Sequence, residues 1–136
     1  MRKAWPSGGS WGKRRIAGSL NNLGLIAAKQ GDYAGAHPFY VECLAIYREL
    51  GVKSGIATSL CNLGIITAHH GDHAGARNLL EESLTIFGEL EDRWGIADSL
   101  GNLGFIAMEQ GEYSEAHKYL CVRWAICERA VAMEST

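Results

Sequence analysis

The chain has 136 residues, of which 13 are basic and 15 are acidic, so its formal net charge is −2 at pH 7. Charges this evenly balanced create no global field that would draw the protein to nucleic acid or to an anionic membrane. No apolar run approaches the ~20 residues of a membrane span, and the length predicts a single domain.

The first residues lack the hydrophobic periodicity of a helix or a strand. Residues 1–12 combine proline, glycine and serine, and we expect them to form a flexible leader. The repeat domain is then expected to occupy residues 13–136.

A six-residue pattern, Ser-Leu-x-Asn-Leu-Gly, occurs three times in the chain. The copies are Ser19–Gly24, Ser59–Gly64 and Ser99–Gly104, and each lies 40 residues after the last. A fixed period of this length is typical of stacked supersecondary units. The sequence therefore predicts a repeat array, which favours a binding surface over a catalytic pocket.

The first element of each repeat is predicted to be an amphipathic helix. Ile16, Leu20, Leu23 and Ala27 follow the spacing i, i+4, i+7, i+11, which places them on one helix face. The same face recurs in the other copies as Ile56, Leu60, Leu63, Thr67 and as Ile96, Leu100, Leu103, Ala107.

Each first helix is predicted to end at a glycine, because glycine best tolerates a left-handed helix end. These glycines are Gly31, Gly71 and Gly111, and an acidic residue follows each of them. We expect Asp32 and Asp72 to cap the helices that come next.

A second helix is predicted after each turn, and it should form an antiparallel hairpin with the first. In the first copy Ala36, Tyr40 and Cys43 share its apolar face. Pro38 lies inside this helix and is predicted to kink it or to delay its start. Small residues recur where paired helices would approach closely, namely Gly24, Gly64, Gly104, Ala36, Ala76 and Ala116.

The pattern Asn-Leu-Gly followed by Gly31-Asp32-Tyr33 and Ala36 resembles the tetratricopeptide repeat, in a long variant of about 40 residues as in bacterial signalling and regulatory proteins. The resemblance covers three units, at 17–56, 57–96 and 97–136. It implies an all-α fold, a right-handed α-solenoid of three antiparallel helix pairs. No polar capping helix follows the third unit, although terminal repeats normally need one.

In this family the first helices line a concave groove, so the resemblance implies a peptide-binding site on their outer faces. Three sets of equivalent residues are candidates: Asn22, Asn62 and Asn102 for contacts with a peptide backbone, Leu25, Ile65 and Phe105 for apolar pockets, and Lys29, His69 and Glu109 for the rim. A carboxamide offers both donors and an acceptor, which suits backbone recognition. The mixed rim favours a partner segment that is apolar and not strongly acidic.

Each set also has a structural interpretation. The asparagines could brace the neighbouring helix instead of gripping a peptide. The large apolar residues could pack against a further helix. We favour the groove for the apolar set, because three equivalent positions agree, and leave the asparagines open between the two roles.

The histidines His69, His70 and His73, with Cys61 upstream, invite a metal interpretation. Cys61 and His69 are eight residues apart on one helix, about 12 Å along its axis, which is too far to share one ion. The sequence also lacks the phosphate-binding, nucleophile-elbow and zinc-protease motifs. We therefore expect a non-enzymatic protein without a metal or cofactor.

The four cysteines show no CxxC spacing and lie within helical patterns. This predicts reduced thiols and a cytoplasmic protein. The expected function is to bind an extended peptide segment of another protein, as a scaffold or regulatory adaptor.

Two other hypotheses remain open. In one, the chain self-associates through its uncapped ends, with Trp124, Cys127, Val131 and Met133 at the interface. In the other, it is a piece of a larger regulator.

Overall fold

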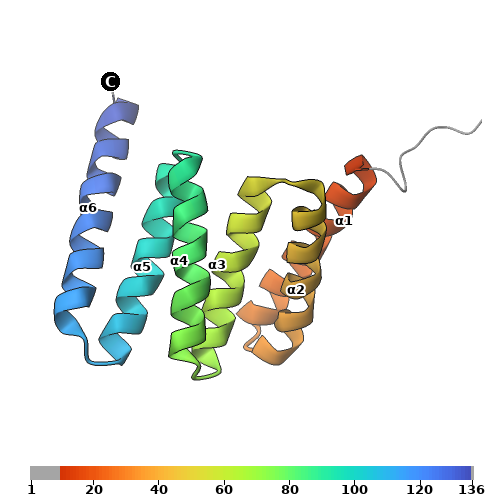
Figure 1. The fold of residues 1–136 in the computed structure, drawn as a ribbon, viewed down its shortest axis with the longest axis horizontal. Coiled ribbons are helices and arrows are strands. Elements are labelled where there is room, and N and C mark those ends of the chain that lie inside the picture. Colours follow the sequence, from red (N-terminus) through yellow and green to blue (C-terminus); the bar gives the residue numbers. More distant parts are fainter. Residues whose placement is uncertain (1–9, 136) are drawn as a thin grey trace, which may run out of the picture.

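The computed structural model describes the backbone of residues 10–135 and the side chains of residues 11–129. This part of the chain forms six helices: α1 (Ser10–Lys29), α2 (Tyr33–Leu50), α3 (Lys53–His69), α4 (His73–Glu89), α5 (Arg93–Glu109) and α6 (Tyr113–Ser135). They follow one another across the molecule in chain order, with α1 at one end and α6 at the other (Figure 1). None of them has the length and apolar composition needed to cross a membrane.

The helices pack in pairs that stack on one another. α1 packs against α2, α3 against α4, and α5 against α6, while α2 contacts α3 and α4 contacts α5. The predicted all-α array of three helix pairs is confirmed. Because α3 also contacts α5 directly, the first helices of neighbouring pairs form a shared face.

The helices begin earlier than the sequence pattern indicates. α1 starts at Ser10, so the last three residues of the expected leader are helical, and residues 1–9 lie outside the described part. Lys13 in the first turns of α1 contacts Glu49 of α2 at 2.6 Å between Nζ and Oε2. α3 and α5 start at Lys53 and Arg93, before the expected unit boundaries at 57 and 97. Each helix pair is therefore offset from the units read from the sequence.

The turns inside the pairs match the prediction. Gly31, Gly71 and Gly111 have φ values of 82°, 89° and 78°, the left-handed conformation that favours glycine. Asp32 caps α2 by accepting a hydrogen bond from the Gly35 N–H at 2.9 Å, and Asp72 caps α4 through Gly75 at the same distance.

Gly35 and Gly75 occupy the first turn of their helices, beneath these caps. A Cβ atom would lie 2.2 Å from the Asp32 carboxylate at Gly35 and 2.4 Å from the Asp72 carboxylate at Gly75. Each cap therefore requires a residue without a side chain at this position.

Pro38 does not delay its helix. α2 begins at Tyr33, directly after its cap, and continues through Pro38 to Leu50. Pro38 itself is exposed. The Asp32 cap supplies a hydrogen bond to the first turn of the helix.

Small residues bring the paired helices close together, as predicted. At Gly64 a Cβ atom would lie 2.8 Å from Leu80 Cγ, and at Gly24 it would lie 2.7 Å from the Tyr40 ring. The alanines across these contacts, Ala36 and Ala76, are fully buried. The first and second helices of each pair are therefore held at the distance that the glycines permit.

The apolar stripe of the first helices is buried in the second and third pairs but not in the first. Leu63 and Leu103 are buried, whereas Leu23 and Ile16 are exposed. The prediction of a core stripe is confirmed only in part for α1: Leu20 and Ala27 are half-buried, but the described chain places no helix pair before α1 to cover the rest.

The junctions between pairs repeat one arrangement. The Tyr47 ring of α2 lies over Gly55 of α3, and the Phe87 ring of α4 lies over Gly95 of α5, where a Cβ atom would approach the rings to 2.4 and 2.3 Å. These contacts fix how one pair stacks on the next and so fix the spacing of α1, α3 and α5.

Candidate functional site

Two hollows lie on the face formed by the first helices. The α1–α3 hollow has a volume of about 240 Å³ and is lined by Leu25, Ala28, Lys29, Tyr33, Tyr40, Asn62, Ile65, Ile66 and His69. The α3–α5 hollow has a volume of about 260 Å³ and is lined by Ile65, Ala68, His69, Leu80, Asn102, Phe105, Ile106 and Glu109. Ile65 and His69 belong to both, so the hollows adjoin. We call the two together the groove.

The two hollows are equivalent under the sequence repeat. Every residue that lines the α3–α5 hollow stands 40 residues after one that lines the α1–α3 hollow. Leu25 corresponds to Ile65, Ile65 to Phe105, and Asn62 to Asn102. The groove is therefore a periodic surface, with one hollow for each junction between first helices.

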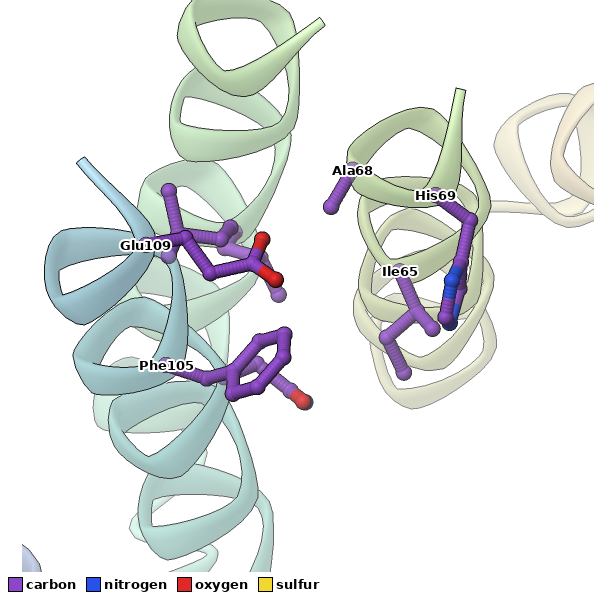
Figure 2. Close-up of a pocket in the computed structure, with 8 residues that line it drawn as sticks. Ile65, Ala68, His69, Phe105 and Glu109 are labelled. Atoms are coloured by element: carbon purple, nitrogen blue, oxygen red, sulfur yellow. The ribbon is translucent and has the colours of Figure 1, made fainter. Parts of the chain in front are cut away.

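Apolar side chains stand on both walls of the groove. Figure 2 shows Phe105 and Glu109 extending from α5 into the α3–α5 hollow, with Ile65 and Ala68 on the facing side of α3. Phe105 is exposed and Ile65 is half-buried. A large exposed phenylalanine beside a half-buried isoleucine provides an apolar surface that a second molecule can cover.

Eight of the nine candidate residues line the groove. Leu25, Lys29, Asn62, Ile65 and His69 meet in the α1–α3 hollow. Asn102, Phe105 and Glu109 join Ile65 and His69 in the α3–α5 hollow. Asn22 lines neither hollow, because the asparagine of each first helix faces the helix pair before it.

Asn62 and Asn102 have structural contacts in addition to their place in the groove. Asn62 Nδ2 donates to Asn21 Oδ1 at 2.9 Å, which ties α3 to α1. Asn102 Nδ2 donates to the Asp98 carbonyl at 3.0 Å and to Cys61 Sγ at 3.7 Å. The bracing role is thus present at both positions. Neither side-chain oxygen accepts a hydrogen bond among those found between the described residues.

The rim residues contact the preceding helix pair. The His69 ring stacks on the Tyr33 ring, with centroids 4.1 Å apart and an interplanar angle of 8°. His73 Nε2 lies 3.0 Å from Glu109 Oε1. These two histidines therefore point to different partners, and the described residues contain no cluster of three metal-ligating side chains.

Residues of the second helices also reach the groove, and none of them was among the predicted candidates. Tyr40 and Leu80 are the equivalent floor residues of the two hollows, and Tyr33 adds a wall to the first. Tyr40 is buried, and this burial, with a smaller effect of Cys43, raises the pKa of its hydroxyl. Their place on the second-helix stripe was the available signal, but a stripe does not tell which residues extend between two first helices.

Cys61 lies behind the groove, beneath Asn102. Burial is the main cause that raises the pKa of its thiol to about 11; Asp98 adds to the shift, and hydrogen bonds from Asn102 and Ser99 oppose it. A thiol that stays protonated is a weak nucleophile and a poor metal ligand. Cys61 therefore acts as a packing residue, and none of the four cysteines forms a disulfide.

A family model described as tetratricopeptide repeat matches residues 15–89 and 56–128, which together span most of the chain. Among solved structures, the TPR domain of Arabidopsis FLU superposes with a TM-score of 0.80 at 18% identity, covering 86% of this chain and 98% of that one. BtubC (BKLC) from P. vanneervenii superposes with a TM-score of 0.77 at 23% identity over 91% of this chain. The chain spans 51% of BtubC. No curated protein sequence matches the chain.

Proposed function

The chain belongs to the tetratricopeptide repeat family, whose domains are generally protein–protein interaction modules and typically non-catalytic, and from this premise we propose that its groove binds an extended peptide segment of another protein. A protein with this activity would serve as a scaffold or a regulatory adaptor.

The observation that carries the proposal is the equivalence of the two hollows. Both present the same order of side chains at the 40-residue period: an aliphatic residue, an alanine, a rim residue and an asparagine. An extended peptide is itself periodic, with side chains that alternate along a nearly straight backbone. A surface with repeated hollows suits such a ligand better than it suits a compact small molecule.

The spacing of the hollows suggests the pattern of the bound segment. Neighbouring helices pack about 8–10 Å apart, and an extended chain advances about 3.3 Å per residue. Two apolar side chains separated by about three residues would therefore reach adjoining hollows. Leu25, Ile65 and Phe105 would contact these side chains, with Tyr40 and Leu80 beneath them.

The asparagines would contact the peptide backbone as acceptors. Asn62 and Asn102 use their amide N–H groups to contact α1 and α3, so their side-chain oxygens are the groups left to receive backbone N–H donors. This arrangement combines the two roles that the sequence left open. A braced side chain also loses less rotamer entropy on binding than a free one.

The rim gives the groove a direction. Lys29 is exposed at the α1 side, whereas Glu109 is exposed at the α5 side beside His73. A segment with its more acidic end near α1 and its more basic end near α5 would have complementary charges.

A peptide selection tests the proposal. Random peptides displayed on phage would be selected on the wild-type protein, and the dissociation constant of a selected peptide would be measured by fluorescence anisotropy. We expect Leu25→Ser and Phe105→Ser each to weaken binding by about tenfold or more, equivalent to about 1.4 kcal/mol. Both side chains are exposed, so the variants should keep the helical circular dichroism of the wild type.

Val41→Ser is the matched control. Val41 is an exposed apolar residue of α2 outside both hollows, so its removal should leave the affinity unchanged. Equal losses in all three variants, or no loss at Leu25 and Phe105, would show that the peptides bind elsewhere.

A further inference from the structure

The two ends of the array expose side chains that its internal junctions bury. In α1, Leu23 is 46% exposed and Ile26 is 54% exposed, whereas the equivalent Leu63 and Ile66 of α3 are 5% and 1% exposed. We call Ile16, Leu23 and Ile26 the N face. The equivalent residues of α3 and α5 pack against the helix pair that comes before them.

The opposite end exposes the other half of the same junction. Leu120 is 39% exposed, whereas its equivalent Leu80 is fully buried against α5. Trp124 is 69% exposed and replaces Leu84, which packs on the core of the α4–α5 junction. We call Leu120, Trp124 and the nearby Phe105 and Met108 the C face. The side chains of Val131 and Met133, also expected at an interface, lie outside the described residues.

We propose that the C face of one copy of this chain docks on the N face of a second copy, in the geometry of its own internal junctions. Leu120 and Trp124 would then cover Leu23 and Ile26, as Leu80 and Leu84 cover Leu103 and Ile106 inside the array. The proposal needs no new mode of packing, because the α2–α3 and α4–α5 junctions already show it.

The sizes of two residues favour a second copy over an ordinary neighbouring repeat. Internal junctions place an aromatic ring over a glycine, Tyr47 on Gly55 and Phe87 on Gly95. At the ends the glycine position holds Arg15 and the aromatic position holds Cys127. An aromatic ring would clash with Arg15, whereas a cysteine leaves room for it. The large and small residues are thus exchanged in a matched way.

Several polar residues of the two ends are also compatible, although the positions of the Arg48–Glu82 pair hold two acidic residues, Glu128 and Glu42. Arg77 of α4 binds Glu112 at 2.7 Å and Gln110 at 3.0 Å across an internal junction. At the ends, His117 of one copy holds the position of Arg77. Asp32 and Gln30 of the other copy hold the positions of Glu112 and Gln110. Tyr113 would likewise face Lys29, at the position of the Tyr33–His69 pair.

Arg123 would supply the remaining polar contacts. It donates from Nε to the Ala97 carbonyl at 3.2 Å, as Ser83 donates to the Ala57 carbonyl at 2.8 Å. Its side chain lies against Gly101. The positions equivalent to Gly101 in the other pairs are Cys61 and Asn21. In the proposed dimer, Arg123 would therefore meet Ser19 and the side-chain oxygen of Asn22 of the second copy.

Docking would also complete the groove, a consequence that rests on the proposed function. Phe105, Met108 and Leu120 already line a hollow at the end of the array. With α1 of a second copy beside it, this hollow would become the next member of the series. Asn22, which lines neither hollow within one chain, would then take the place of Asn62 and Asn102.

A dimer formed between two different faces keeps a free N face and a free C face, so the assembly should grow with concentration. We expect the average mass of the wild-type chain, measured by analytical ultracentrifugation, to rise above the monomer mass of 14.8 kDa as concentration rises. Ile26→Glu on the N face and Trp124→Glu on the C face should each remain monomeric. Both positions are exposed, and circular dichroism would verify that the variants fold.

Mixing the two variants provides the decisive result. Each retains one intact face, so the mixture should form a one-to-one dimer and nothing larger. Val41→Glu is the control, because the equivalent internal residue, Glu81, is exposed in the array, and this variant should assemble like the wild type.

Three results would overturn the proposal: a wild type that stays monomeric, a mixture that stays monomeric, or a dimer that only one of the two substitutions disrupts. The last result would show that like faces pair with like. Because the readout is mass in the absence of peptide, failure here would leave the peptide-binding proposal standing.

Discussion

Asn62 illustrates how one residue can serve both the fold and the groove. Its amide donates to Asn21 of the preceding first helix, while the rest of its side chain lines the α1–α3 hollow. Asn22 stands in the same Leu-x-Asn-Leu-Gly pattern, but the described residues include no helix pair before it. Comparing the two positions therefore separates the brace from the intrinsic effect of asparagine in a helix.

We expect Asn62→Ala to lower the free energy of unfolding by about 1 kcal/mol relative to Asn22→Ala, because only Asn62 loses a hydrogen bond between helices. Both substitutions exchange asparagine for a better helix former, so that contribution cancels in the difference. Urea denaturation followed by circular dichroism measures it. Equal stabilities would show that the Asn62–Asn21 contact contributes nothing.

The buried thiol of Cys61 should make stability depend on pH in the alkaline range. Burial raises its pKa from 9.0 to about 11, so the unfolded chain loses this proton first as the pH rises. The contribution of the neutral buried thiol is complete below about pH 9 and falls as the pH approaches 11.

We therefore expect the stability difference between the wild type and Cys61→Ala to shrink by on the order of 2 kcal/mol between about pH 8 and about pH 10.5. The raised pKa values of Tyr40 and Cys43 act in the same direction in both proteins and cancel in the difference. Urea denaturation at a series of pH values measures it, and a difference that does not change with pH would contradict the assignment.

At the scale of helices, glycines decide how closely the pairs pack. Gly64 leaves no room for a methyl group, because a Cβ atom would lie 2.8 Å from Leu80 Cγ and 3.4 Å from the Ala76 carbonyl. Gly18 of α1, also inside a helix, has nothing within 4 Å of the same position. The same substitution should therefore have opposite effects at the two sites.

We expect Gly64→Ala to destabilise the protein by about 1–3 kcal/mol through overpacking. Gly18→Ala should stabilise it by up to about 1 kcal/mol through helix propensity. Thermal and urea denaturation of the two variants measure these changes. A Gly64→Ala variant as stable as the wild type would mean that α3 and α4 can separate without loss.

Helix ends could be predicted where local chemistry determines them, and not elsewhere. Gly31 and Asp32 specify the turn and the cap of α2 by their own conformational and hydrogen-bonding preferences, so both predictions were confirmed. The start of α1 at Ser10 falls in a serine, tryptophan and glycine segment whose composition does not mark a helix. The predicted unit boundaries at 57 and 97 were also too late, because α3 and α5 start several residues before the repeated motif.

At the scale of the whole molecule, the groove arises from stacking. Equivalent residues on α1, α3 and α5 could be listed from the period alone, which is why eight of the nine candidates line a hollow. The floor residues Tyr40 and Leu80 could not, since they come from second helices and their reach depends on the angle between pairs. Asn22 falls outside for a related reason: a hollow needs two neighbouring first helices.

The central claim is that a peptide binds along the face shared by α1, α3 and α5. A titration of the 15N-labelled protein with a selected peptide, followed by amide chemical shifts, tests it most directly. We predict that the largest shifts map to the groove, around Leu25, Ile65 and Phe105, with little change near Ala45 and Thr85, which are exposed on the second helices and line neither hollow. Shifts concentrated on α2, α4 and α6, or on the N and C faces alone, would contradict the account.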